Sequence, residues 1–213
     1  MKIGVNCGHT VSGTTGCGAV GYLNESDETR NIGYKVIKQL ESYGHSVIDC
    51  TNDKAASTND NLKAIVNKAN AQALDLFISI HLNAGGGKGC ECYTYGGKQL
   101  NEAVKICSQL ESLGFKNRGV KDGTALYVLK KTTAKAILIE VCFVDNKTDA
   151  EIYNKVGATK IADAICNAIV EKAELDDVTI IKNKIGLADE TIKYLQNYKY
   201  GTELIHKIAN AVK

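Results

Sequence analysis

The sequence predicts an α/β fold, with a mainly parallel, twisted sheet flanked by helices on both faces and a small C-terminal helical module. The mostly apolar run 74–80 stops abruptly at His81, and it reads as a strand buried on both faces. Shorter apolar runs over 2–7 and 136–139 alternate with stretches of helical spacing, as in βαβ units. A change in character after about residue 172 sets the end of the chain apart.

The remaining elements follow from local patterns. Asn24 can cap a helix that begins at Glu25 and ends at Gly44, and Ser57 with Asp60 resembles a capping box for the next helix. The other expected elements are strands 46–50 and 89–95, helix 100–114, a loop over 115–125, a short strand 126–129, and helices 147–153 and 161–169.

The C-terminal module, residues 178–213, is expected to contain a strand-like stretch, 178–181, and two short amphipathic helices. Asp189 and Thr202 can cap these helices. A segment of this length buries little apolar surface by itself, so we expect it to dock on the main domain, a second copy or a ligand. We therefore divide the chain into domains 1–172 and 178–213.

Charge and hydropathy exclude several classes of function. There are 26 Lys and Arg residues against 24 Asp and Glu, giving a formal net charge of +2, and the lysines are scattered. This balance argues against strong nonspecific binding to nucleic acid. No apolar run is long enough to cross a membrane, and the chain opens without the pattern of a signal peptide. We expect synthesis in the cytoplasm and no membrane partner.

The eight cysteines form no CxxC pair, and several fall in apolar runs. Free cysteine behaves there as a small hydrophobic residue, so reduced, packed thiols are the main expectation. A disulfide or a thiolate metal site is the alternative.

Three residues that can carry chemistry follow predicted strands. His9 comes after the first strand, His81 ends the central strand, and Glu140 ends the strand that begins at Ala136. In open α/β sheets the ligand crevice lies beyond the carboxyl ends of the strands, so these side chains are expected to converge if the strands are neighbours. A lone histidine at a strand end is more often structural. We also assign structural roles to His45, which follows Gly44, and to His206, in the predicted terminal helix.

Two imidazoles and a carboxylate suit Zn²⁺, which takes such ligands in tetrahedral sites and in catalytic sites keeps one position for water. The third ligand should lie near His9 in space. Glu25 is the best candidate because it opens the following helix, with Asp27 and Glu28 as competitors. Glu140 would then serve as general base and acid.

Several segments together resemble the zinc-dependent N-acetylmuramoyl-L-alanine amidases of the type-3 family, found in bacterial autolysins and phage endolysins. The resemblance covers roughly residues 1–172. Its segments are Cys7-Gly8-His9, Asn24-Glu25, DLFISIHLNA, GFKNRGVKDGTALYVL over 114–129 and AILIEVCFVDNKTDAEIY over 136–153.

The resemblance implies that His9, Glu25 and His81 bind zinc and that Glu140 is the catalytic glutamate. It implies hydrolysis of the peptidoglycan amide that joins N-acetylmuramic acid to L-alanine. Substrate contacts are expected from the loop residues Asn117, Arg118 and Lys121.

The chain departs from the family pattern in two places. It has Asn6-Cys7-Gly8-His9 where the family commonly has Asp-Pro-Gly-His, which leaves open which group orients His9. Ala134-Lys135-Ala136 stands where a proline is frequent. Neither departure changes an expected ligand.

Short helical tails follow amidase domains in endolysins from Gram-positive hosts, which implies wall attachment by residues 178–213. We expect an endolysin that reaches the wall after holin-type release or cell lysis. The alternatives are a sporulation mother-cell autolysin of the same activity and a non-catalytic peptidoglycan-binding protein. The tail could instead make a homodimer.

Overall fold

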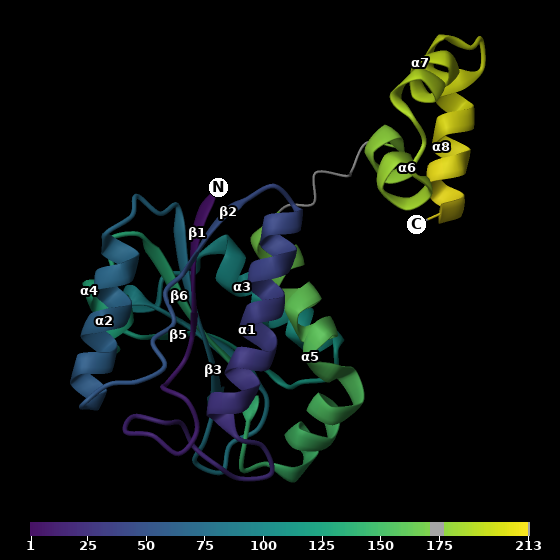
Figure 1. Ribbon diagram of the computed structural model, residues 1–213. Helices are drawn as coiled ribbons and strands as arrows, with labels where there is room; N and C mark the ends of the chain where they lie inside the picture. The colour runs from purple at the N-terminus through teal and green to yellow at the C-terminus, as the bar shows by residue number, and fades with distance from the viewer. Residues whose placement is uncertain (171–176, 213) are drawn as a thin grey trace. The chain divides into compact units, whose positions relative to one another are not determined.

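The computed structural model of the protein describes residues 1–170 and 177–212 (Figure 1). The chain divides into two compact units, Met1–Ile169 and Val170–Lys213. The predicted end of the first domain, residue 172, lies outside the described residues.

The first unit is built on a six-stranded sheet with the strand order β2-β1-β3-β6-β4-β5. The strands are β1 (Lys2–Cys7), β2 (Ser46–Asp49), β3 (Leu76–Asn83), β4 (Cys90–Thr94), β5 (Asn117–Asp122) and β6 (Lys135–Phe143). Strands β2, β1, β3 and β6 run parallel to one another. Strand β4 is antiparallel to β6, and β5 is parallel to β4. The predicted α/β fold with a mainly parallel sheet is therefore confirmed.

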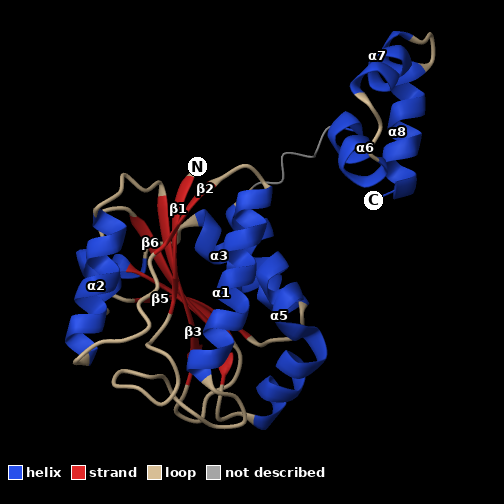
Figure 2. Ribbon diagram, in the orientation of Figure 1, coloured by secondary structure: helices blue, strands red, loops and turns tan. Residues whose placement is uncertain are grey.

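Helices cover both faces of this sheet, as predicted (Figure 2). One face carries α1 (Glu25–Ser42), α3 (Asn101–Ser112) and α5 (Lys147–Ile169), and the other carries α2 (Thr58–Asn70) and α4 (Tyr127–Lys131). A short 3₁₀ helix, η1 (Tyr95–Gly97), follows β4. The backbone of α5 is non-helical at Gly157, with φ 79°, so the two helices predicted after Asp145 are two parts of α5. Among the described residues, no helix combines the length and apolar character that a membrane span requires.

The centre of the sheet is mostly apolar, with Asn6 and Ser79 as buried polar exceptions. Leu76, Phe77, Ile78 and Ile80 of β3 have no exposed surface. Burying each such side chain contributes about 1.5–3 kcal/mol of favourable transfer free energy. Because helices cover both faces, successive residues of β3 are buried whichever way they point. This packing fixes the register between β3 and β6, in which His81 lies opposite Glu140.

Two predictions for residues 115–129 were wrong. The expected loop contains β5, and the expected strand 126–129 instead leads into helix α4. Strand β5 lies at the edge of the sheet beside β4 and is partly exposed, so its sequence, NRGVKD, lacks an apolar pattern. The buried residues of the apolar run at 126–129, Val128 and Leu129, belong to the same hydrophobic cluster as Phe77. A short apolar run does not distinguish helix from strand by periodicity.

The second unit consists of α6 (Asp177–Ile185), α7 (Asp189–Asn197) and α8 (Gly201–Val212). The prediction of a strand-like stretch over 178–181 was wrong, because these residues belong to α6. Ile180 and Ile181 are buried against Ile205 and Ala209 of α8. The two helices predicted after them are confirmed as α7 and α8.

Asp149 ties the loop after β3 to the end of β6. Its side chain is fully buried, and its Oδ2 accepts hydrogen bonds from the backbone N–H groups of Gly89 (2.7 Å) and Phe143 (2.9 Å). Buried N–H groups of this kind need a partner, since each one left unpaired costs about 1–3 kcal/mol. Asp149 therefore holds the loop that follows the His81 strand against the end of the Glu140 strand.

We predict that Asp149→Ala lowers the free energy of unfolding by about 2–4 kcal/mol, because two buried N–H groups lose their acceptor. Urea unfolding followed by circular dichroism measures this loss. Glu151→Ala is the matched control on the exposed face of the same helix, and it should change stability by less than about 0.5 kcal/mol. Equal stabilities for the two variants would contradict the assigned role.

Candidate metal centre and active site

His9 lies just beyond β1 in an unusual backbone conformation. Its φ is 64°, in the left-handed region that residues other than glycine rarely adopt. Helix α1 holds this backbone, because Arg30 donates to the carbonyl of His9 (3.0 Å) and Thr29 donates to that of Gly8 (3.1 Å). The ring is oriented by Nδ1, 3.2 Å from the carbonyl oxygen of Gly16. Nε2 is thereby directed at the carboxylate of Glu25.

His81 lies near the end of β3, beside Gly8. A Cβ atom at Gly8 would stand 2.4 Å from the nearest atom of the His81 ring, so no side chain fits there. The two imidazole rings make an edge-on contact, with 4.9 Å between the centroids of His9 and His81. The missing side chain at Gly8 therefore provides the space in which the second histidine lies next to the first.

Glu25, the first residue of α1, places a carboxylate between these rings. It is 4% exposed, and Oε1 lies 3.1 Å from both His9 Nε2 and His81 Nδ1. Oε2 accepts from the backbone N–H of Ala19 (3.0 Å). A Cβ at Gly18 would stand 2.6 Å from Oε2, so that glycine too leaves room for the carboxylate.

The two competitors for the third position lie elsewhere. Asp27 is exposed, and the Glu28 carboxylate accepts hydrogen bonds from Tyr153 and Asn31. Among the described residues, His9, Glu25 and His81 form a group whose ligand atoms all lie within 4.8 Å of one another. Two imidazole nitrogens and one carboxylate oxygen at this spacing fit the donor set of a zinc site.

The electrostatics of this group follow from burial and from the shared carboxylate. Burial alone would raise the pKa of Glu25, but hydrogen bonds from His81 and His9 lower it well below its usual range. Burial lowers the pKa of His81, and this effect outweighs the attraction of Glu25. For the less buried His9, burial is outweighed by the bond to Glu25, and the pKa is raised. Metal ligands must be deprotonated, so metal binding would compete with protonation of His9.

Glu140, on β6, lies opposite both His81 of β3 and Glu91 of β4. Paired residues on neighbouring strands point to the same face, so the Glu140 side chain adjoins the histidine–glutamate group. Its Oε2 is buried and has no hydrogen-bond partner among the residues that the structure describes. Burial raises the pKa of Glu140 well above its usual range, and the charges of Glu25 and Glu91 raise it further. A carboxylate in such a place can take up and release a proton.

The three predicted substrate-binding residues all lie on β5. Arg118 donates to Glu91 (Nε to Oε2, 2.7 Å), and its guanidinium lies over the ring of Phe143. The Asn117 side chain donates to Glu111 (3.1 Å). Lys121 is exposed and in register with Tyr93 of β4. Glu91 was missed from the sequence. It is only 2% exposed, and it also accepts from Asn83 (2.8 Å) and Tyr93 (2.9 Å).

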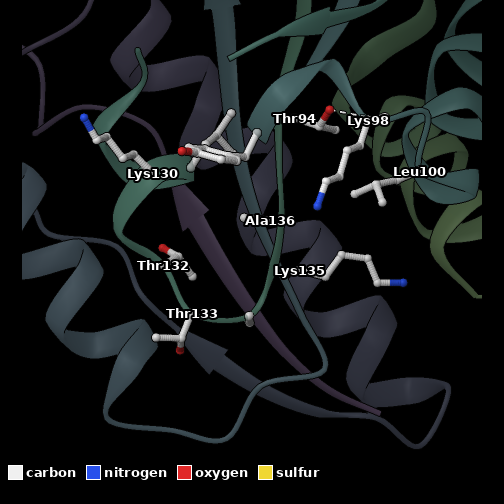
Figure 3. A pocket seen from close by; sticks show the side chains of 11 residues that line it. Thr94, Lys98, Leu100, Lys130, Thr132, Thr133, Lys135 and Ala136 are labelled. Carbon is white, nitrogen blue, oxygen red and sulfur yellow. Dashed lines mark hydrogen bonds between the residues drawn. The ribbon is translucent and has the colours of Figure 1, made fainter. Parts of the chain in front are cut away.

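Two cavities lie at different ends of the sheet. A cavity of about 300 Å³ reaches both histidines, and its apolar wall comes from α2, α4 and β6. Its lining includes Asn6, His9, His81, Leu62, Ile65, Leu126, Val128 and Leu138. The other cavity, of about 370 Å³, lies where β6 begins (Figure 3). Lys98, Thr132 and Lys135 line it, and none of the predicted site residues does.

A family model described as N-acetylmuramoyl-L-alanine amidase matches residues 3–171. The chain belongs to this amidase family. An uncharacterized protein of Clostridium perfringens is 38% identical over 180 residues, covering 81% of this chain and 52% of the relative. The sporulation-specific N-acetylmuramoyl-L-alanine amidase of Bacillus subtilis is 34% identical over 159 residues, covering 70% and 59%.

Among solved structures, the catalytic domain of the CD27L endolysin targeting Clostridia difficile is 32% identical, with a TM-score of 0.75. That match covers 81% of this chain and 98% of the solved domain. The chain spans about half the length of the first curated relatives it matches. The family resemblance of the sequence is thus confirmed, and the family-model match covers the first unit but ends at residue 171.

Proposed function

We propose that this amidase-family chain hydrolyses the amide between N-acetylmuramic acid and L-alanine in peptidoglycan, with zinc held by His9, Glu25 and His81. The observation that carries the proposal is the meeting of these three ligand atoms within 4.8 Å of one another, beside the buried carboxylate of Glu140. Family membership supports the assignment of this amide as the bond that is cut. A non-catalytic peptidoglycan binder would have no need of an unpartnered acid beside such a group.

When bound, zinc would supply Lewis-acid activation of a water molecule and of the scissile carbonyl. The chain's own residues supply the proton transfers. Glu140 takes a proton from the attacking water as the new C–O bond forms. It then gives that proton to the departing nitrogen of L-alanine as the C–N bond breaks. The raised pKa of Glu140 suits the second half of this cycle, because the carboxyl group must hold the proton between the two steps.

We predict that Glu140→Gln lowers kcat by about 10²–10⁴-fold while the zinc content stays unchanged. Glutamine keeps the size of the side chain but cannot accept the proton. Release of free L-alanine amino groups from purified walls measures turnover, and elemental analysis measures zinc. Glu41→Gln, on the exposed side of α1, is the control and should retain full activity. Near-normal turnover by Glu140→Gln would rule out the assigned role.

We also propose that the exposed edge strand β5 contacts the muropeptide through Asn117, Arg118 and Lys121. Lys121 shares its face with Tyr93, next to Glu91 and Glu140, which supports this assignment. Lys121→Ala should raise KM several-fold with little change in kcat, since it removes a contact made by bound substrate and transition state alike. Lys38→Ala on α1 serves as the control. An unchanged KM for Lys121→Ala would exclude the contact.

We propose that the protein acts as an endolysin, reaching the wall after holin-type release or cell lysis. The endolysin domain among its structural relatives supports this role. The sporulation-specific relative supports the alternative of a mother-cell autolysin. A holin gene beside the coding sequence would favour the endolysin, and a sporulation-controlled promoter would favour the autolysin.

We propose that the second unit binds the cell wall through its exposed tyrosines. Tyr194, Tyr198 and Tyr200 are 73%, 50% and 56% exposed, and the rings of the last two lie edge to face. Exposed aromatic side chains of this kind are typical of interaction surfaces. Homodimer formation through the same surface is the alternative.

Replacing the three tyrosines together by alanine should reduce co-sedimentation of the full chain with purified walls. Tyr34→Ala on α1 is the control, since that ring is also exposed. Light scattering of the same proteins tests the alternative. A dimer that the triple variant dissociates, with wall binding unchanged, would assign the surface to self-association.

A further inference from the structure

Two polar side chains are buried side by side in the middle of the sheet, behind the proposed metal centre. Asn6 of β1 is 1% exposed, Ser79 of β3 is fully buried, and the two are paired in register. Polar groups in such a place are costly unless they are hydrogen-bonded. The amide Nδ2 of Asn6 donates to Ser79 Oγ at 2.8 Å. The neighbouring core positions are apolar, so hydrophobic residues at positions 6 and 79 would also pack there. Packing alone therefore does not explain why two polar residues occupy these positions.

Ser79 connects this pair to His81. Its Oγ lies 3.1 Å from His81 Nε2, while His81 Nδ1 lies 3.1 Å from Glu25 Oε1. The carboxylate of Glu25 can only accept a hydrogen bond, so His81 Nδ1 is the donor of that pair, while Ser79 Oγ accepts from the Asn6 amide and can donate its own proton to His81 Nε2. Nε2 is then the acceptor of the ring, and Nδ1 carries the proton toward Glu25.

We propose that Asn6 and Ser79 are positioning residues that hold the His81 ring so that its Nδ1, not its Nε2, faces the metal, with the Ser79 hydroxyl bonded to Nε2 in either tautomer. The inference rests on the proposed function for the identity of the metal ligands. His9 uses the opposite atom, because its Nδ1 is bound to the carbonyl of Gly16 and its Nε2 faces Glu25. The two histidines therefore present different ring nitrogens to the same carboxylate.

A hydroxyl group suits this position because it can both donate and accept. In the metal-free protein it donates to Nε2. When Nδ1 gives up its proton to bind a metal, the neutral ring carries its proton on Nε2, which then donates to Ser79 Oγ. Asn6 Nδ2 can stay bound throughout, since the serine oxygen has two lone pairs. An alanine at position 79 supports neither state, and leucine or valine would fill the space without holding the ring.

The experiment measures zinc affinity and the tautomer of His81 in the full chain. We expect Ser79→Ala to weaken zinc binding by about 10–100-fold in a chelator competition assay, as removal of outer hydrogen bonds to a metal-binding histidine does. Asn6→Ala should weaken binding too. Because Asn6 acts through Ser79, the double variant should bind within about twofold of Ser79→Ala. Thr94→Val is the matched control, removing a buried strand hydroxyl at the far end of the sheet.

The tautomer is read from ¹⁵N chemical shifts of the His81 ring in the metal-free protein, assigned with His81→Gln. The wild type should carry its proton on Nδ1, and Ser79→Ala should shift the population toward Nε2. Zinc affinity equal to wild type in folded Ser79→Ala, or an unchanged tautomer, would overturn the proposal. If Ser79→Ala does not fold, Asn6→Ala provides both readouts. A wild type that binds no zinc would refute the proposed function. The tautomer shift would still show whether Ser79 acts on the His81 ring.

Discussion

The structure depends on one carboxylate held between two imidazole rings. Glu25 Oε1 lies 3.1 Å from a nitrogen of His9 and 3.1 Å from a nitrogen of His81, in a place where the carboxylate is almost fully buried. A buried carboxylate without partners would be strongly unfavourable. The two histidines stabilise its charge, and a metal ion would do so more strongly. Three separate elements, β1, α1 and β3, must therefore keep their relative positions for this group to exist.

The rest of the unit can be understood as what keeps those elements in place. The apolar centre of β3 and β6 fixes the register that brings His81 opposite Glu140. Arg30 and Thr29 of α1 hold the strained backbone at His9 from one side. At Gly8 and Gly18 the absence of a side chain leaves room for His81 and Glu25. Packing thus sets the strands, and hydrogen bonds together with two glycines set the final positions of the ligands.

Much of this arrangement could be predicted from the sequence because strand ends carry a strong signal. The central strand ends in a histidine, and parallel neighbours align their carboxyl ends, so His9, His81 and Glu140 were expected to meet on the condition that their three strands are neighbours. The choice of Glu25 over Asp27 and Glu28 required knowing where helix α1 begins. Strand β5 could not be predicted, since an edge strand with partly exposed residues has no apolar pattern. Glu91 and the Asn6–Ser79 pair were also missed. They lie within strands, and their roles depend on partners on neighbouring strands that the sequence does not identify.

The central claim is that His9, Glu25 and His81 bind a single zinc ion. Crystals of the zinc-loaded protein, measured on both sides of the zinc absorption edge, test it most directly. The account predicts one anomalous peak within about 2.0–2.2 Å of His9 Nε2, His81 Nδ1 and a Glu25 carboxylate oxygen. An anomalous peak at another place, or none at these three residues, would contradict it.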